Sequence, residues 1–178
     1  MNREERIWKI IESDLPDDAG ISAEDYYCVG IEYETGLSVP SLDIDLAIKC
    51  YEKAASMGYT MAMLGLARVY QNLQKPELAY KWLLEAAHDE INRTALYRLG
   101  IACFDGDIVV QDLKKAFHYI SMAHEKGEEL ANYYLGYYAE NGLFMAVDLE
   151  KALTYYRAGA VNYDFRCMDR LKELEIKF

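Results

Sequence analysis

Aromatic side chains are the residues of this sequence whose types and spacing best fit a chemical task. Tyrosine occurs 16 times in 178 residues, and the stretch NYYLGYYAENG places four tyrosines around Gly136. A rigid ring with a polar tip offers a large contact area and loses little conformational entropy on binding. The pattern therefore indicates recognition of another molecule through packing contacts.

Motifs for catalysis and metal binding are scarce. The sequence has no phosphate-binding loop, no dinucleotide-binding glycine motif, no paired-histidine zinc motif and no nucleophile-elbow motif. His118 and His124 would lie about 120° apart around a helix, and we expect them, like His88, at helix surfaces or ends. We therefore expect no enzymatic activity, no cofactor and no metal site.

The cysteines and the N-terminal segment bear on the cellular compartment. Cys28, Cys50, Cys103 and Cys167 are far apart and form no C-x-x-C pair. Charged residues begin at position 3, and the first segment lacks the apolar core of a signal peptide; no stretch approaches the roughly 18 apolar residues of a membrane span. We therefore expect free, buried thiols in a reducing cytoplasm.

The charge of the chain limits the classes of partner. The formal net charge is −11 and the pI is about 4.7. Such a surface repels phosphate groups, so we expect no nucleic-acid partner and no membrane partner. Two readings of the charge stay open, since it can serve solubility alone or attract a basic partner protein.

A repeat in the sequence indicates the architecture that carries the rings. Gly30, Gly65, Gly100 and Gly136 each follow a leucine or valine, at intervals of 35, 35 and 36 residues. A period of this length is typical of a solenoid built from small supersecondary units. A second segment with alanines at helical spacing, such as Ala116 and Ala123, follows each glycine segment. Each unit is therefore predicted to be helix, short loop, helix.

The start of the second helix in each unit has its own signal. Asp43, Asp112 and Asp148 each stand four residues before the first alanine of the second segment, where a carboxylate can cap free backbone N–H groups. In the second unit Pro76 occupies a position suited to the first turn of a helix. These residues predict where the second helices begin.

The repeated glycines require a compensating gain. A glycine inside a helix costs about 1 kcal/mol relative to alanine, so four cost roughly 4 kcal/mol. The alanines of the second helices suggest the gain, because glycine facing alanine would let two helix backbones approach closely. We therefore predict that the four glycines lie at buried contacts between helices.

These patterns resemble a known family. The segment ALYRLGIACFDGDIVVQDLKKAFHYISMAHEKG is similar to the Sel-one-like repeat, a relative of the tetratricopeptide repeat. The resemblance covers about residues 25–166, although the second unit lacks two loop residues and carries Gln71 where the loop glycine is expected. It implies an all-α fold, an α/α superhelix of four repeats with capping helices.

The resemblance also implies a division of the chain, which we expect to form a single solenoid domain over residues 1–178. The expected segments are an N-terminal capping helix and linker at 1–24, repeats at 25–59, 60–94, 95–130 and 131–166, and a C-terminal capping helix at 167–178.

By analogy with the tetratricopeptide repeat, the first helix of each unit would line a concave groove. The groove would then be an apolar, aromatic strip with acidic residues near one edge, and such an edge favours lysine or arginine on a ligand. An alternative remains open, in which the same rings only pack between neighbouring repeats. The expected groove residues are Tyr27, Ile31, Glu34, Leu66, Tyr97, Ile101, Phe104, Asp105, Tyr133, Tyr137 and Glu140.

The resemblance and the missing catalytic motifs lead to one main functional hypothesis. The chain is expected to be a non-enzymatic adaptor or scaffold whose partner is a protein or peptide with basic and apolar residues. The alternative is an acidic inhibitor, such as an immunity or antitoxin-like protein, that occludes a basic enzyme. The identity of the partner, the pathway and the oligomeric state do not follow from the sequence.

Overall fold

The structure is a computed structural model of the chain, and it describes residues 5, 9–10, 20–37, 42–88, 92–144 and 146–175. Most of the expected N-terminal capping segment at 1–24 lies outside these residues. So does Phe178, at the end of the expected C-terminal capping helix.

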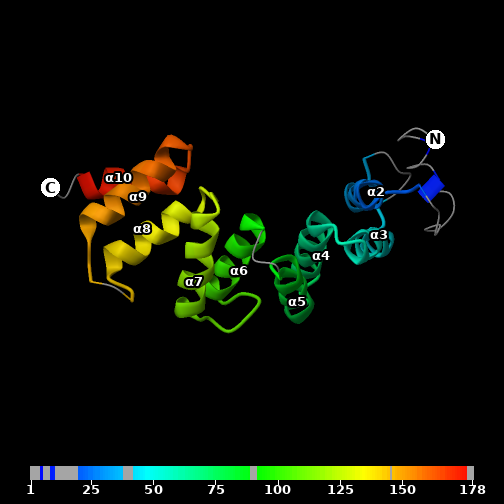
Figure 1. Cartoon of the computed structure of the whole chain (residues 1–178), viewed down its shortest axis with the longest axis horizontal. Coiled ribbons are helices and arrows are strands. Elements are labelled where there is room, and N and C mark those ends of the chain that lie inside the picture. The colour runs from blue at the N-terminus through cyan, green and yellow to red at the C-terminus, as the bar shows by residue number, and fades with distance from the viewer. Residues whose placement is uncertain are drawn as a thin grey trace. The chain divides into compact units, whose positions relative to one another are not determined.

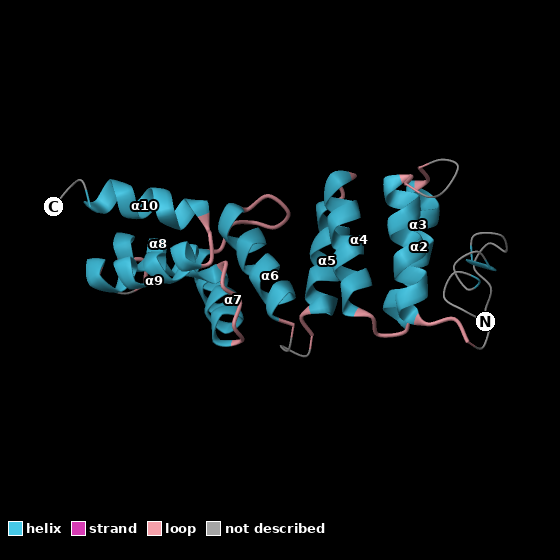
Figure 2. Cartoon of the chain, turned by 90° about the horizontal axis from the view of Figure 1, so that it is seen from above, coloured by secondary structure: helices cyan, strands magenta, loops and turns pink. Residues whose placement is uncertain are grey.

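All regular secondary structure in the described part of the chain is helical (Figure 2). The elements follow one another as helix–loop–helix pairs, and Figure 1 labels them along the chain. The helices are α2 (Ala23–Thr35), α3 (Ile44–Ser56), α4 (Thr60–Asn72), α5 (Pro76–Ala86), α6 (Arg93–Asp105), α7 (Leu113–Glu125), α8 (Ala131–Asn141), α9 (Leu149–Val161) and α10 (Phe165–Glu175). The all-α fold class expected from the sequence is confirmed.

The contacts between helices follow the expected repeats. Helix α2 packs against α3, α4 against α5, α6 against α7 and α8 against α9, and α10 packs on α9. Within this scheme the contacts divide the chain into two compact units, Met1–Ala86 and Ala87–Phe178, where the sequence led us to expect one domain. The first unit holds repeats one and two, and the second holds repeats three and four with α10.

The predicted helix starts are confirmed. The Oδ1 atom of Asp43 accepts a hydrogen bond of 2.9 Å from the backbone N of Leu46, and Asp112 and Asp148 cap α7 and α9 in the same way. Pro76 is the first residue of α5. These caps work because the first N–H groups of a helix have no partner within the helix.

The first helices of repeats one, three and four end on glycines in the left-handed conformation, at Gly36, Gly106 and Gly142. A left-handed residue at this point favours glycine because it has no Cβ. In the second repeat α4 continues through Gln71, and Gln74 takes the left-handed conformation at φ 56°. The missing loop glycine therefore corresponds to a longer helix and a different turn.

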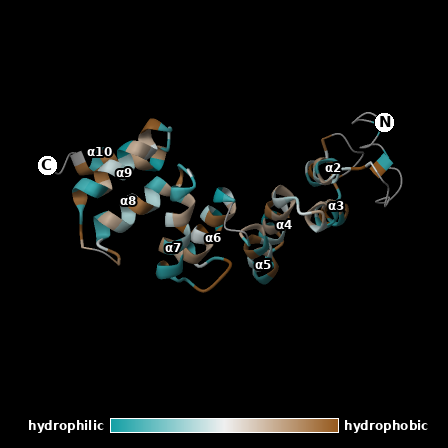
Figure 3. Ribbon diagram, in the orientation of Figure 1, coloured by the Kyte–Doolittle hydropathy of each residue, from teal (hydrophilic) through white to brown (hydrophobic). Residues whose placement is uncertain are grey.

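Each helix carries both apolar and polar residues (Figure 3). The buried apolar residues form the core of each unit. Four tyrosines, Tyr26, Tyr51, Tyr138 and Tyr156, are among the largest fully buried side chains. In the second unit one core cluster joins α6, α7 and α8, and another joins α8, α9 and α10. Much of the tyrosine content is thus core packing.

The repeat glycines lie inside helices and are buried, as predicted, but their neighbours differ from the expectation. A Cβ atom at Gly30 would lie 2.5 Å from Cε1 of Tyr51, and one at Gly136 would lie 2.5 Å from Cε1 of Tyr156. The expectation that glycine faces alanine is therefore wrong at these positions. The missing Cβ makes room for a buried tyrosine ring of the second helix.

The other two repeat glycines differ from each other. A Cβ atom at Gly100 would lie 2.5 Å from Cγ1 of Ile120, on the second helix of the same repeat. At Gly65 the nearest neighbour is the ring of Tyr51, at an ordinary contact distance of 3.4 Å. The need to make space for a bulky side chain explains Gly30, Gly100 and Gly136. At Gly65 a Cβ atom would fit without a clash.

Candidate functional site

The expected groove residues of the first unit lie on α2 and α4. Tyr27, Ile31 and Glu34 are partly exposed. Leu66 is 0% exposed, so its assignment as a residue that contacts a partner is wrong. It is one of the seven buried residues of α4, a helix that packs against both α3 and α5.

In the second unit the expected groove residues lie on α6 and α8. Asp105 is exposed, and the others are partly exposed side chains that lie on the first helices of two consecutive repeats. These partly exposed residues are Tyr97, Ile101, Phe104, Tyr133, Tyr137 and Glu140.

The rings of α6 and α8 form one cluster. The centroid of Phe104 lies 5.0 Å from that of Tyr134 and 5.5 Å from that of Tyr137, both in edge-to-face geometry. Tyr134 also contacts Tyr97 and Tyr133, at 6.1 and 5.1 Å. Such edge-to-face pairs are favourable contacts that hold the rings rigidly. We call these five residues the α6–α8 aromatic cluster.

One edge of this cluster is covered by Arg166, from the first turn of α10. Its guanidinium carbon lies 4.7 Å from the ring centroid of Tyr133 and 5.4 Å from that of Tyr134. The side chain of Arg166 also donates two hydrogen bonds to Asp164, at 2.7 and 3.0 Å, and its Nη1 lies 3.5 Å from the hydroxyl oxygen of Tyr134. A cation over aromatic faces is a stabilising arrangement, so these rings already hold a cation of the chain itself.

The packing of the α6–α8 aromatic cluster shifts the pKa values of its tyrosines and of Asp164. Burial raises the pKa of Tyr134 to about 12, and burial also raises the pKa of Tyr97, although Arg166 opposes this. Burial alone would raise the pKa of Asp164, but the hydrogen bonds and charge of Arg166 bring that pKa below its ordinary value. At neutral pH the phenols are therefore protonated and the carboxylate is ionised.

The two glutamates expected at the acidic edge are engaged within the fold. In the first unit Glu34 accepts hydrogen bonds from the hydroxyl of Tyr51 at 2.7 Å and from Nη2 of Arg68 at 2.8 Å. Burial, together with the hydrogen bond to Glu34, raises the pKa of Tyr51 far above its ordinary value. The carboxylate thus joins the second helix of repeat one to the first helix of repeat two.

The second unit repeats this arrangement. Glu140 accepts hydrogen bonds of 2.9 Å from the hydroxyl of Tyr156 and from Nε of Arg170. Burial and the hydrogen bond to Glu140 raise the pKa of Tyr156 far above its ordinary value. We call these two arrangements the Glu–Tyr–Arg triads. They leave Asp105 as the exposed carboxylate among the expected groove residues.

Three arginines of this site, Arg68, Arg166 and Arg170, were not expected from the sequence. Arg68 lies 34 residues after Glu34, and Arg170 lies 30 residues after Glu140, so no fixed spacing marks the pairs. The expected groove residues all lie on first helices, whereas Tyr51 and Tyr156 lie on second helices.

Residues that could take part in chemistry stay apart. The described residues contain no group of three or more His, Cys, Asp and Glu side chains that could hold a metal ion. Cys28, Cys50, Cys103 and Cys167 all belong to the described residues and form no disulfide; the last three are buried, and Cys28 is partly exposed. His124 packs edge-to-face with Tyr155, at 5.6 Å between centroids.

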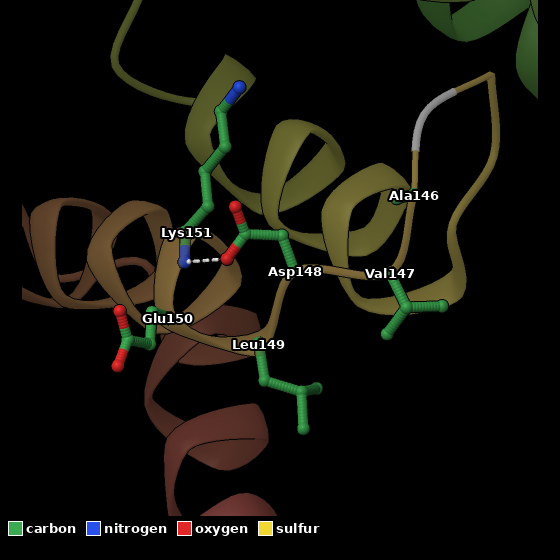
Figure 4. Close-up of a pocket in the computed structure, with 6 residues that line it drawn as sticks. All are labelled: Ala146, Val147, Asp148, Leu149, Glu150 and Lys151. Carbon is green, nitrogen blue, oxygen red and sulfur yellow. Dashed lines mark hydrogen bonds between the residues drawn. The ribbon is translucent and has the colours of Figure 1, made fainter.

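Two pockets of the second unit are lined by described residues. The first is an open hollow of about 580 Å³ at the start of α9, where Asp148 accepts a hydrogen bond from the backbone N of Lys151 (Figure 4). The second has a volume of about 190 Å³ and lies between the start of α6, the α7–α8 turn and the α9–α10 turn. It is lined by charged residues, among them Arg93 and Glu129.

The helices pair within each repeat, and the second helix of one repeat packs on the first helix of the next within each unit. This arrangement defines a helical repeat protein with an α/α solenoid fold. The Sel1 repeat model matches residues 23–59, 60–89, 94–128 and 130–160, so the chain belongs to the Sel1 repeat family. Proteins of this family generally mediate protein–protein interactions. None of the described helices is long and apolar enough to cross a lipid bilayer.

Solved structures show the same fold. A protective antigen present in uropathogenic Escherichia coli strains, which displays an SLR fold, superposes with a TM-score of 0.79 at 22% identity over 96% of this chain. This chain spans only 35% of the length of that protein. A Sel1 repeat protein from Oxalobacter formigenes superposes with a TM-score of 0.75 at 25% identity, over 93% of this chain and 72% of that one. No relative is found among curated proteins.

Proposed function

We propose that this chain is a non-enzymatic adaptor that binds a protein or peptide through the exposed side of the α6–α8 aromatic cluster. The observation that carries the proposal is this rigid set of rings on consecutive first helices of a Sel1 repeat protein, in which Tyr134 is buried and the other four rings are partly exposed. Preordered rings bury area with little loss of side-chain entropy. The four cysteines, all within the described residues, form no disulfide, which suits the cytoplasm as the proposed location.

The arrangement of charges refines the kind of partner. Arg166 covers Tyr133, and Arg170 neutralises Glu140, so that edge no longer offers a free negative charge. Asp105 remains exposed at the end of α6, next to Phe104 in the sequence. The proposed ligand therefore places an apolar side chain on Phe104 and Tyr137 and a lysine or arginine near Asp105.

A binding experiment with the full chain tests this surface. The probe is a short synthetic peptide of leucine and arginine, labelled for fluorescence anisotropy. Tyr137→Ala is expected to weaken binding about tenfold, which is typical of a central aromatic contact. Tyr119→Ala, on the second helix α7, is the matched control and should leave the affinity unchanged. Equal affinity of Tyr137→Ala and the unaltered chain would refute the assignment of the groove.

The net charge of −11 favours a second candidate function, that of an acidic inhibitor of a basic enzyme. Electrostatic attraction accelerates association at low salt, and salt screens it. The probes are basic enzymes such as lysozyme. This candidate is favoured if the chain inhibits such an enzyme and associates with it orders of magnitude more slowly at high salt than at low salt. Binding with a weak dependence on salt would favour the adaptor.

A further inference from the structure

The turn between α9 and α10 departs from the matching turns of the other repeats. After α3 and α7, the residue that follows the C-cap is a glycine, Gly58 or Gly127, with φ at 82°. After α9 the corresponding residue is Tyr163, with φ at 62°. All three close the helix through the same pair of backbone hydrogen bonds.

The conformation of Tyr163 is one that a residue with a Cβ atom adopts at a cost. Phe144 has a similar φ of 62°, and its ring packs against Phe117 and Tyr138, so packing offsets the cost there. The side chain of Tyr163 is 78% exposed. The fold therefore gains little from this ring, and glycine would suit the backbone better.

The residues of this turn alternate between two environments. Val161, Tyr163 and Phe165 are 76%, 78% and 74% exposed. The residues between them, Asn162 and Asp164, line the pocket of about 190 Å³. Three large apolar side chains so exposed within five residues are typical of an interaction surface.

The pocket beside the turn has acidic character. Asp164 is held by Arg166, and Glu128 lies 4.0 Å from Arg93. Glu129 is exposed, and its carboxylate forms no hydrogen bond or ion pair with the described residues. Glu129 is thus the carboxylate of this pocket that can pair with a cationic side chain of another molecule.

We propose that the α9–α10 turn is a second docking surface, and that it takes a peptide segment in which a lysine or arginine is flanked by apolar residues. The cation would lie in the pocket near Glu129, and the apolar residues would pack on Tyr163 and Phe165. The net charge of −11 favours a basic partner over a second copy of the chain, since two copies repel. This surface is separate from the proposed groove, so either can hold without the other.

The leucine–arginine peptide tests this proposal on the full chain. Tyr163→Gly is the decisive variant, because it removes the ring, keeps the net charge and gives the backbone its preferred residue, so folding is not at risk. We expect it to weaken peptide binding about tenfold. Phe165→Ser should weaken binding in the same direction. Val110→Ser, which alters a side chain 87% exposed in the α6–α7 loop, is the matched control and should have no effect.

Two altered peptides test the chemistry of the occupant. Replacing arginine with glutamate, or leucine with serine, should each abolish binding to the turn.

Full affinity in Tyr163→Gly, or no binding of the original peptide up to about 1 mM, would overturn the proposal. Loss of affinity in Tyr137→Ala but not in Tyr163→Gly would overturn it and leave the proposed groove standing. The reverse result would refute the groove and support the turn. Sedimentation that shows dimers dissociated by Tyr163→Gly would assign the surface to a second copy and overturn the basic partner.

Discussion

The fourth repeat is packed more tightly around its glycine than the second repeat is. At Gly136 the ring of Tyr156 fills the space that a Cβ atom would take, and the hydroxyl of that ring is bound by Glu140. At Gly65 a Cβ atom would meet its nearest neighbour, the ring of Tyr51, at 3.4 Å. Both glycines occupy the same place in the repeat, but only one of them is required by its surroundings.

The residues opposite the glycine explain the difference. The second repeat has Leu83 and Val69 at the places of Tyr156 and Glu140, so it lacks both the ring and the carboxylate. A repeat period therefore identifies a position in the backbone, whereas the side chain across the helix contact decides whether glycine is needed there. Substitutions on either side of this comparison test it.

Gly136→Ala should have the largest effect. The new methyl group would displace the ring of Tyr156, which is 0% exposed. Overpacking of this kind costs about 3 kcal/mol, and the roughly 1 kcal/mol by which alanine favours the helix offsets only part of that cost. Urea unfolding of the full chain and hydrogen exchange of α8 and α9 measure the loss. Unchanged exchange in α8 and α9 would mean that the ring moves aside freely, and the comparison would then lose its physical basis.

Glu140→Gln should destabilise the second unit by about 2 kcal/mol. Glutamine can still accept a hydrogen bond from Tyr156, but it loses the charge-assisted bonds from Arg170. The arginine side chain is 31% exposed, so water compensates for part of the loss. Glu173→Gln is the matched control, because Glu173 pairs with the same arginine but is 59% exposed. The control should cost less than about 0.5 kcal/mol, and an equal cost for both variants would contradict the role of the triad.

Much of the fold could be predicted because its signals are local. The aspartate caps and Pro76 act within one or two helical turns, and the 35-residue period spans a single helix pair; each is found where it was expected. The site was harder to predict, since its geometry depends on partners that are distant in sequence. Arg68 and Arg170 reach their glutamates from the next helix pair or from α10, and the burial of Leu66 depends on which helices surround it.

Alkaline pH should distinguish the ring-filled fourth repeat from the second repeat, where Met63 stands in place of Tyr134. Burial raises the pKa of Tyr134 to about 12, whereas an unfolded tyrosine titrates near pH 10. The unfolded state therefore loses its proton first as the pH rises, and stability is lost above about pH 10. This one group should contribute a loss of more than about 1 kcal/mol by pH 11.

The measurement is urea unfolding of the full chain between pH 9 and pH 11. Tyr134→Phe has no proton to lose at this position, so its stability should fall less steeply over that range. The slope with pH is compared, and not the absolute stability, because the substitution also removes the contact of the hydroxyl with Arg166. Equal slopes for the two proteins would show that Tyr134 titrates as an exposed tyrosine does.

Gly65→Ala should have the smallest effect and the opposite sign. A methyl group at this position meets the ring of Tyr51 at ordinary van der Waals distance, so no side chain has to move. Alanine favours the helix over glycine by about 1 kcal/mol, and the variant should therefore gain up to that amount in urea unfolding. A loss as large as that of Gly136→Ala would mean that the second repeat depends on its glycine too. In that case the tyrosine ring of the fourth repeat would not be the reason why glycine is needed.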